Sequence, residues 1–339
     1  MKLYSNEIVF RGHPDKVCDQ ISDAILDECL KQDKLTRAGI EVMGGKGKIF
    51  ITGEVTTKAK FDVTKITKRV LSDVGYDTNY EVVDNLGKQS LDIALGTNED
   101  VLGAGDNGMM FGYACRETDK FLPKAMVILQ ELSEAYDNLR LADTRFLADG
   151  KAQITGYYED NKLVKIKTFT VCYQNTEENR KSTDRKLIQI IEEICKKYDV
   201  LVEEYLINPT GKFLIGGFAG DAGLTGRKIV VDSYQSFAKV GGGAFSGKDP
   251  TKVDRSGAYK AREIAKDILV HNNEYEWCSV QLSYAIGIEE PLAIYIMTDK
   301  GEIEVNRKLY QDCKPRNIIN DMDLRNICYE ERARFGHFR

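Results

Sequence analysis

A pattern of helix, strand and second helix recurs three times along the 339 residues and limits the folds open to this chain. In the first copy, apolar side chains recur at every fourth position from Val17 to Cys29. This spacing predicts a helix over about 14–32 with acidic residues on its other face. The β-branched segment Lys48–Thr57 predicts a strand. A second helix follows, and Asp62 is placed to cap its start.

The second and third copies repeat these kinds of element. We expect helices over about 123–139, 183–197, 255–270 and 305–313, and strands over about 153–158, 164–173, 212–216, 228–232, 278–286 and 293–298. Because helices and strands interleave without regular βαβ alternation, the pattern favours an α+β fold of three similar subdomains. The alternative is that any chain of mixed helices and strands can be divided into thirds. The pattern alone leaves this alternative open.

The predicted fold is therefore a pseudo-threefold arrangement in which each subdomain is a β-sheet covered by helices. The N-terminal subdomain is expected at 1–95, the central one at 96–213 and the C-terminal one at 214–339, with segments free to interleave in space.

Composition and charge exclude several classes of protein. A hydrophobic content of 42% is ample for a buried core, and a net charge of -5 argues against nucleic acid or an anionic membrane as partner. No segment is apolar enough for a signal peptide or a membrane span. Eight cysteines without a CxxC pair favour reduced thiols. We expect a soluble, cytoplasmic protein.

The segment Gly241–Asp254, GGGAFSGKDPTKVD, carries the clearest chemical signal. Consecutive glycines let backbone amides face an anion, and Lys248 and Lys252 add positive charge. Part of the segment fits the P-loop pattern GxxxxGK. However, Asp249 stands where a P-loop needs Ser or Thr for magnesium, and no clear strand precedes the segment. We interpret it as a polyphosphate-binding loop of another kind, the alternative being a glycine-rich surface loop.

A second signal is Gly12–Lys16, GHPDK, where Pro14 suits the first turn of a helix. His13 and Asp15 would then lie at the helix N-terminus, which attracts anions. His13 could donate a hydrogen bond to a phosphate and Asp15 could hold Mg²⁺. A purely structural helix cap is an equal alternative.

Two further glycine-rich segments present charged side chains. Gly103–Gly112 places Asp106 on a tight turn, and Gly220–Lys228 ends in the basic pair Arg227 and Lys228. Arginine suits bidentate phosphate binding, whereas lysine acts as a point charge. A glycine-rich hairpin and a charged loop are the structural alternatives. Two other acids, Glu41 and Glu54, lie in strand-like segments, where exposure to solvent is the simpler expectation.

Together these segments resemble the S-adenosylmethionine synthetase (methionine adenosyltransferase) family. The resemblance runs in order from about residue 4 to Phe338. It rests on the following segments: GHPDK (12–16), GEVTT (53–57), GAGDNGMMFGYA (103–114), INPTGKF (207–213), GDAGLTGRKIVVD (220–232) and GGGAFSGKDPTKVDRSGAY (241–259).

The resemblance implies a fold of three α+β subdomains and a homodimer, or a dimer of dimers, with active sites at the subunit interface. It also implies the reaction. The sulfur of L-methionine attacks C5′ of ATP, and the tripolyphosphate that leaves is cleaved to pyrophosphate and phosphate. Because sulfur is nucleophilic without deprotonation, positioning and charge stabilisation lower the barrier.

Site roles carry over by position. For ATP the resemblance implies His13, Asp149, Lys151, Lys212, Phe213, Asp221, Arg227, Lys228, Ala244 and Lys248, of which His13, Lys151, Arg227 and Lys248 would be catalytic. For methionine it implies Glu54, Asp106, Asp221 and Lys252. For metals it implies Asp15 and Asp254 with Mg²⁺, and Glu41 with K⁺, which replaces the expectation of a merely exposed Glu41.

Several positions depart from the family pattern. Arg11 stands where Glu is usual and Lys212 where Arg is common. In 86–95 the acid Asp92 is retained, but Leu91 replaces a proline and Leu95 a glutamine that contacts methionine. The loop Gly96–Leu102 is short, and the chain ends soon after Phe338 without the usual aromatic and acidic tail. These departures leave the phosphate contacts intact and bear on methionine affinity.

They also keep alternatives to the leading hypothesis, an active synthetase. One is a paralogue that adenosylates another thioether. Another is a non-catalytic nucleotide-binding homologue, which the retained His13, Asp15, Lys248 and Asp254 disfavour. The last is a P-loop kinase or ATPase, against which Asp249 argues.

Overall fold

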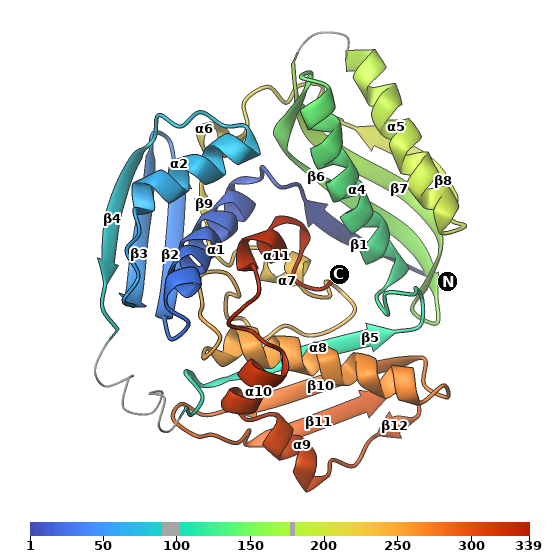
Figure 1. Cartoon of the computed structure of the whole chain (residues 1–339). Coiled ribbons are helices and arrows are strands. Elements are labelled where there is room, and N and C mark those ends of the chain that lie inside the picture. Colours follow the sequence, from blue (N-terminus) through green and yellow to red (C-terminus); the bar gives the residue numbers. More distant parts are fainter. Residues whose placement is uncertain (90–101, 177–179) are drawn as a thin grey trace.

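The computed structural model describes residues 1–89, 102–176 and 180–339 and contains three four-stranded sheets (Figure 1). The first sheet has the order β1 (Lys2–Val9), β6 (Phe146–Glu159), β7 (Lys162–Asn175) and β8 (Val202–Ile207). The second has the order β4 (Glu81–Gly87), β3 (Lys48–Thr56), β2 (Arg37–Gly45) and β9 (Gly223–Leu224). The third has the order β12 (Gly301–Glu302), β11 (Ala293–Thr298), β10 (Trp277–Tyr284) and β5 (Gly108–Cys115).

The three sheets exchange strands in a cycle. Each is built on a sequence-local antiparallel hairpin, β2–β3, β6–β7 or β10–β11. A strand from elsewhere in the chain pairs antiparallel with the first strand of each hairpin: β9 with β2, β1 with β6 and β5 with β10. Each third of the chain therefore lends one strand to another third. This exchange ties the α+β subdomains into one pseudo-threefold unit.

A helix of 19 residues stands at the start of each third: α1 (Pro14–Gln32), α4 (Lys124–Ala142) and α8 (Val253–His271). In the first two thirds a second helix joins two parallel strands, α2 (Val63–Val74) between β3 and β4, and α5 (Arg180–Lys197) between β7 and β8. The shorter helices are α6 (Gly217–Gly220), α7 (Ile229–Asp232), α9 (Arg307–Asp312), α10 (Pro315–Asp321) and α11 (Tyr329–Phe335).

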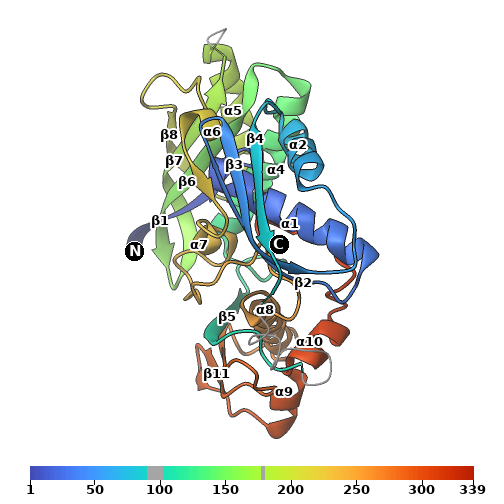
Figure 2. The same cartoon turned by 90° about the vertical axis from the view of Figure 1, so that its left-hand side faces the viewer.

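Helices cover the inner side of the assembly. Figure 1 shows the three sheets around a centre in which α11 and the C-terminus lie. Turned by 90°, Figure 2 shows α1 and α2 on one side of β3 and β4. One hydrophobic core lies between the β1–β6–β7–β8 sheet and its helices, and a larger core joins the other two sheets. Among the described residues, no helix combines the length and apolarity needed to cross a membrane.

Helix α1 is buried on its acidic face as well as on its apolar face. Four aspartates spaced by one helical turn accept backbone N–H groups from the C-terminal third of the chain. The pairs are Asp15 with Leu224, Asp19 with Gly226, Asp23 with Gly247, and Asp27 with Tyr329 and Glu330. This row of carboxylates attaches the glycine-rich segments and α11 to α1, so it positions the candidate site.

Most predicted elements are confirmed, including the helix at 14–32 and the cap of α2 by Asp62, whose side chain accepts from Lys65 N. Two predicted strands are wrong. Residues 212–216 have no regular structure, and 228–232 contains the short helix α7 instead. In α7 the carboxylate of Asp232 is buried against the ammonium of Lys16, and this contact outweighs the strand preference of the β-branched residues. All eight cysteines are free.

Candidate active site

His13 caps the N-terminus of α1, and its position fixes which ring nitrogen carries the proton. Its Nδ1 accepts a hydrogen bond from Asp15 N at 3.2 Å. Burial, together with the positive charge of Lys228, lowers the pKa of His13 to about 4. The ring is therefore neutral near pH 7 with its proton on Nε2, which makes Nε2 a hydrogen-bond donor.

Asp15, on the first turn of α1, is buried beneath the basic pair of the segment 220–228. Its Oδ2 lies 2.5 Å from Lys228 Nζ, and its Oδ1 lies 3.6 Å from Arg227 Nε and accepts from Leu224 N at 2.9 Å. Burial opposes ionisation, but the Lys228 and Leu224 hydrogen bonds outweigh it and lower the pKa of Asp15. Asp15 is therefore a carboxylate that holds two cations beside His13.

A cavity of about 290 Å³ opens next to this helix end. The predicted residues among those that line it are His13, Asp149, Lys151, Phe213 and Asp221. Cys172 and Ile215 line it too, and no sequence pattern indicates either residue. Cys172 reaches the cavity because the β6–β7 pairing places it opposite Lys151, a register that only the fold reveals.

Two more predicted residues have defined surroundings here. Asp149 is 6% exposed, and its Oδ2 accepts from Gly217 N at 2.8 Å. Burial raises the pKa of Asp149 to about 6 in spite of this bond. Lys212 is exposed and adjoins Phe213 in the chain. His13, Asp15, Asp149, Lys151, Phe213, Asp221, Arg227 and Lys228 are called group 1 below.

The glycine-rich segment 241–254 forms a loop before α8. Lys248 Nζ donates to the carboxylate of Asp254, which lies in the first turn of α8. Gly243 lies against this pair, since a Cβ there would come within 2.2 Å of the Asp254 carboxylate. In the described chain, the amides of residues 241–244 donate to no protein acceptor. The loop can therefore offer both amides and an ammonium to an anion.

Asp249 has a structural task, which excludes the P-loop interpretation. It is fully buried, and its Oδ2 accepts from Ala38 N at 2.9 Å. Its Oδ1 accepts from the amide and hydroxyl of Thr251 at 2.9 and 2.7 Å. Both oxygens are thus used within the protein, and the side chain anchors the loop to β2.

The remaining predicted residues gather near this loop. Lys252 is 8% exposed, and its Nζ lies 3.6 Å from Glu54 Oε1 and 3.8 Å from Asp249 Oδ2 without a hydrogen bond to either. Gly105 packs against the Lys252 side chain, and Asp106 is the next residue after Gly105. Asp106 is exposed, and its Oδ1 accepts from Asn107 N at 2.7 Å.

Glu41 on β2 is exposed, as the residue pattern alone predicts. Partial burial of its carboxylate raises the pKa of Glu41, while the nearby Lys248 lowers it. Ala244 lies against Gly226, where a Cβ would come within 2.6 Å of the Ala244 side chain. Group 2 below comprises Glu41, Glu54, Asp106, Ala244, Lys248, Lys252 and Asp254.

The two groups are distinct within one chain. Across 1–89, 102–176 and 180–339, no hydrogen bond or ion pair links a member of group 1 to a member of group 2. Both are attached to α1, group 1 through Asp15 and the loop of group 2 through Asp23. Leu91, Asp92, Leu95 and the loop after Leu95 lie outside the described residues up to position 101.

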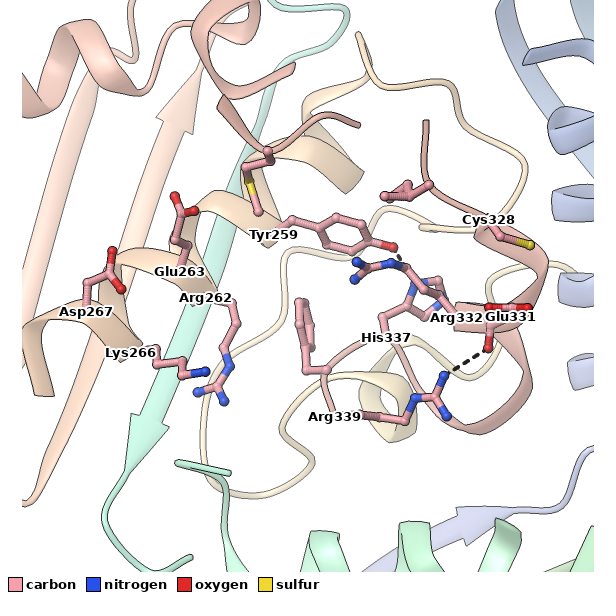
Figure 3. Close-up of a pocket in the computed structure, with 13 residues that line it drawn as sticks. Tyr259, Arg262, Glu263, Lys266, Asp267, Cys328, Glu331, Arg332, His337 and Arg339 are labelled. Carbon is pink, nitrogen blue, oxygen red and sulfur yellow. Dashed lines mark hydrogen bonds between the residues drawn. The ribbon is translucent and has the colours of Figure 1, made fainter. Parts of the chain in front are cut away.

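A larger cavity, of about 730 Å³, contains none of the predicted residues. Figure 3 shows that its walls come from α8, α11 and the C-terminal residues. Its polar groups serve the fold: the Tyr259 hydroxyl bonds His337 Nδ1 at 2.7 Å, and the Arg262 guanidinium donates to the carbonyl oxygens of residues 113, 120 and 121. The predicted site residues therefore lie at the smaller cavity and the loop, and not here.

The acids fit a metal that is shared with a ligand. Within the described residues, no three side chains of His, Cys, Asp or Glu converge as a metal cage. Mg²⁺ is commonly held by one or two carboxylates together with substrate phosphates. Asp15 and Asp254 are carboxylates of that kind, each paired with a lysine and each next to other phosphate-binding candidates.

Comparison with known proteins gives a single family. Models described as "S-adenosylmethionine synthetase, N-terminal domain", "central domain" and "C-terminal domain" match residues 1–94, 101–213 and 215–339. The chain is 41% identical, over 369 aligned residues, to a protein of Clostridium tetani (strain Massachusetts / E88) named S-adenosylmethionine synthase. The match covers 99% of this chain and 94% of that one.

Proposed function

The chain belongs to the S-adenosylmethionine synthetase family and is a methionine adenosyltransferase, and from this premise we propose how its residues divide the work. The methionine sulfur attacks C5′ of ATP in line with the departing tripolyphosphate, which is then cleaved to pyrophosphate and phosphate. Group 1 binds the nucleotide, and group 2 supplies the rest of the phosphate contacts and the methionine contacts.

In this proposal His13 stabilises the oxygen that leaves C5′. The ring is neutral, and Nε2–H is its donor, because Nδ1 already accepts from Asp15 N. A fixed donor aimed at a developing negative charge lowers the barrier without reorganisation. No base is needed, because the sulfur attacks without losing a proton.

The phosphates are bound by cations from both groups. Arg227, Lys228 and Lys151 come from group 1, and Lys248 comes from group 2 with the backbone amides near Ala244. Asp15 and Asp254 would hold Mg²⁺, which supplies charge neutralisation of the tripolyphosphate when bound. Lys228 and Lys248 pair with these same carboxylates. When a polyphosphate binds with its metal, the lysines can therefore turn from these carboxylates to the phosphates, and the carboxylates can bind the metal.

Adenosine and methionine occupy the two sides of the reacting carbon. Phe213, with the adjacent Lys212, flanks the adenosine, and Asp149 and Asp221 share its cavity. Methionine contacts Glu54, Asp106 and Lys252, with Asp221 between the two substrates. Within the described residues the buried Lys252 ammonium has no hydrogen-bond acceptor, so it is available to the amino-acid carboxylate.

Two copies of the chain complete each site, so the protein is a homodimer or a dimer of dimers. An apolar face supports this. Met43, Phe50 and Leu224 are neighbours across β3, β2 and β9 and are 46%, 39% and 37% exposed. Large apolar side chains grouped on a surface are typical of interfaces. Glu41 lies two residues before Met43 on the same face of β2, so group 2 borders this surface. K⁺ would bind there at Glu41.

The observation that carries the proposal is the neutral His13 cap beside Asp15, Lys228 and the 290 Å³ cavity. The test is to incubate the purified protein with ATP, Mg²⁺, K⁺ and L-methionine and to measure sulfonium product and pyrophosphate. Both are expected in equal amounts. Product from another thioether but not from methionine would favour the paralogue. ATP binding without turnover of any thioether would contradict both enzymatic readings.

A further inference from the structure

Backbone atoms of Gly12 hold the loop that carries His13 in place through hydrogen bonds to other parts of the chain. Gly12 N donates to Ala148 O at 3.2 Å, and the Tyr76 hydroxyl donates to Gly12 O. A Cβ at Gly12 would lie 2.4 Å from the Ala148 carbonyl, so only glycine lets the loop approach β6 this closely. These contacts fix the backbone at Gly12, and a side chain of the same loop makes further contacts.

Arg11 is that side chain, and it is 7% exposed. Its Nε donates to Gln20 Oε1 at 2.8 Å, and Gln20 Nε2 donates back to Arg11 O at 2.8 Å. Gln20 is fully buried and also donates to Lys16 O at 2.9 Å. These two hydrogen bonds form a closed pair, which connects Arg11, two residues before His13, to Gln20 in the second turn of α1.

The guanidinium of Arg11 also reaches α4. Its NH1 lies 3.5 Å from Asp137 Oδ2, and Arg140 Nε lies 2.6 Å from the other oxygen of the same carboxylate. Burial and the nearby Arg334 lower the pKa of Arg11, and its buried NH2 has no acceptor in the part of the chain that the structure describes. Such a poorly compensated buried charge costs stability. Arrangements that cost stability are commonly found where function requires a fixed geometry.

We propose that Arg11 is a positioning residue that orients the His13 imidazole through its closed pair with Gln20. The inference rests on the proposed role of His13. Arg11 lines neither the cavity nor the loop of group 2, so it acts on the reaction only through the loop backbone.

A spectroscopic test reads the imidazole directly. The chain has three histidines, so ¹H–¹⁵N spectra of the ring nitrogens can be assigned with His13→Gln. Arg11→Met should shift or broaden the His13 signals and leave those of His271 unchanged. The matched control is Arg140→Met, which removes an equally buried guanidinium from the same Asp137 without touching the loop. It should leave the His13 signals as in the parent protein.

Kinetics give the second readout. In Arg11→Met, kcat should fall about tenfold or more, because a misplaced donor loses transition-state contact, while KM for methionine stays within about twofold. Arg11→Lys can still donate to Gln20 and should recover part of kcat. If Arg11→Met does not fold, Gln20→Met breaks the same pair and carries the same expectation.

The outcomes separate this inference from the role of His13. Unchanged His13 signals with kcat within twofold in Arg11→Met would overturn the inference. So would an equal loss of kcat in Arg140→Met. Full activity of His13→Gln would instead contradict the proposed role of His13, while the spectra would still decide whether Arg11 orients the ring.

Discussion

The two ring nitrogens of His13 have different roles, and both roles require that the imidazole is neutral. Nδ1 closes the cap of α1, which leaves Nε2–H for a ligand. Five influences act on the ring: burial, Lys228, Lys151 and Lys16 disfavour a second proton, and only Asp15 favours it. A cationic imidazole would lose the cap, so structure and chemistry require the same protonation state.

This environment predicts a pH-dependent stability. The pKa of His13 is about 4 in the folded protein and about 6.5 when the chain is unfolded. Because the folded value is lower, the stabilisation is present above about pH 6.5 and is lost as pH falls through about 4. The upper limit of this loss is about 3 kcal/mol, less screening at the partly exposed ring.

The measurement compares the free energy of unfolding of the parent protein and of His13→Gln at pH 7.5 and pH 4.5. Other groups titrate in both proteins, so they largely cancel in the difference. The parent should lose stability relative to the variant at the lower pH. A difference that does not change with pH would show that burial does not hold the ring neutral.

Lys248 allows a cleaner separation of chemistry from folding. Its side chain is 18% exposed and pairs with Asp254, itself 11% exposed. In Lys248→Ala, turnover should be abolished, because the loop loses its phosphate-binding ammonium, while the circular dichroism spectrum remains that of the folded protein. Lys300→Ala, which removes the exposed pair with Asp299, is the control and should stay fully active. Full activity of Lys248→Ala would mean that the loop has another role.

At the scale of elements, α1 is the piece to which the rest of the site is attached. Asp23 illustrates this: its two oxygens lie 2.6 and 2.8 Å from Arg255 NH2, and one also accepts from Gly247 N at 2.8 Å. Both charged side chains are fully buried, and the Arg255 guanidinium lies 4.2 Å from the Tyr329 ring centroid. One contact thus joins α1, the glycine-rich loop, α8 and α11.

Removing half of this buried pair should be costly. Arg255→Met leaves the Asp23 carboxylate buried and uncompensated, which should lower the free energy of unfolding by about 3–5 kcal/mol in chemical denaturation. The double variant Asp23→Asn with Arg255→Met keeps an acceptor for Gly247 N but contains no buried charge. It should therefore be more stable than Arg255→Met alone. An additive result would show that the two charges are not coupled.

The sequence predicts elements well where the pattern is long and local. The helix at 14–32 is confirmed because its apolar repeat, Pro14 and the following strand all agree. The segment 228–232 fails because its β-branched residues are outweighed by a contact with Lys16, which is more than two hundred residues away. Nothing near Asp232 in the sequence records that contact. From the sequence, Asp249 could be used to exclude a P-loop. Its role in anchoring the loop to β2 could be recognised only from the fold.

At the scale of the whole molecule, the cyclic exchange of β1, β5 and β9 lies beyond sequence patterns. An edge strand looks the same in sequence whichever sheet it joins, and here each one joins a hairpin far away in the chain. The same limit applies to the site. Residues as close in sequence as Arg227 and Lys248 fall into different groups, because the loops that carry them attach at different turns of α1.

The division into two groups predicts complementation between inactive variants. His13→Gln damages group 1 and Lys248→Ala damages group 2, so each protein alone should be nearly inactive. If one site combines group 1 of one copy with group 2 of the other, a mixed dimer has one doubly damaged site and one intact site. Unfolding and refolding an equal mixture should then restore about a quarter of the parent activity, since about half of the dimers are mixed and each has one working site. His13→Gln mixed with Asp15→Asn, both in group 1, is the control and should restore none. If the first mixture also stayed inactive although size-exclusion and native mass spectrometry showed mixed dimers, both groups would have to act within a single chain.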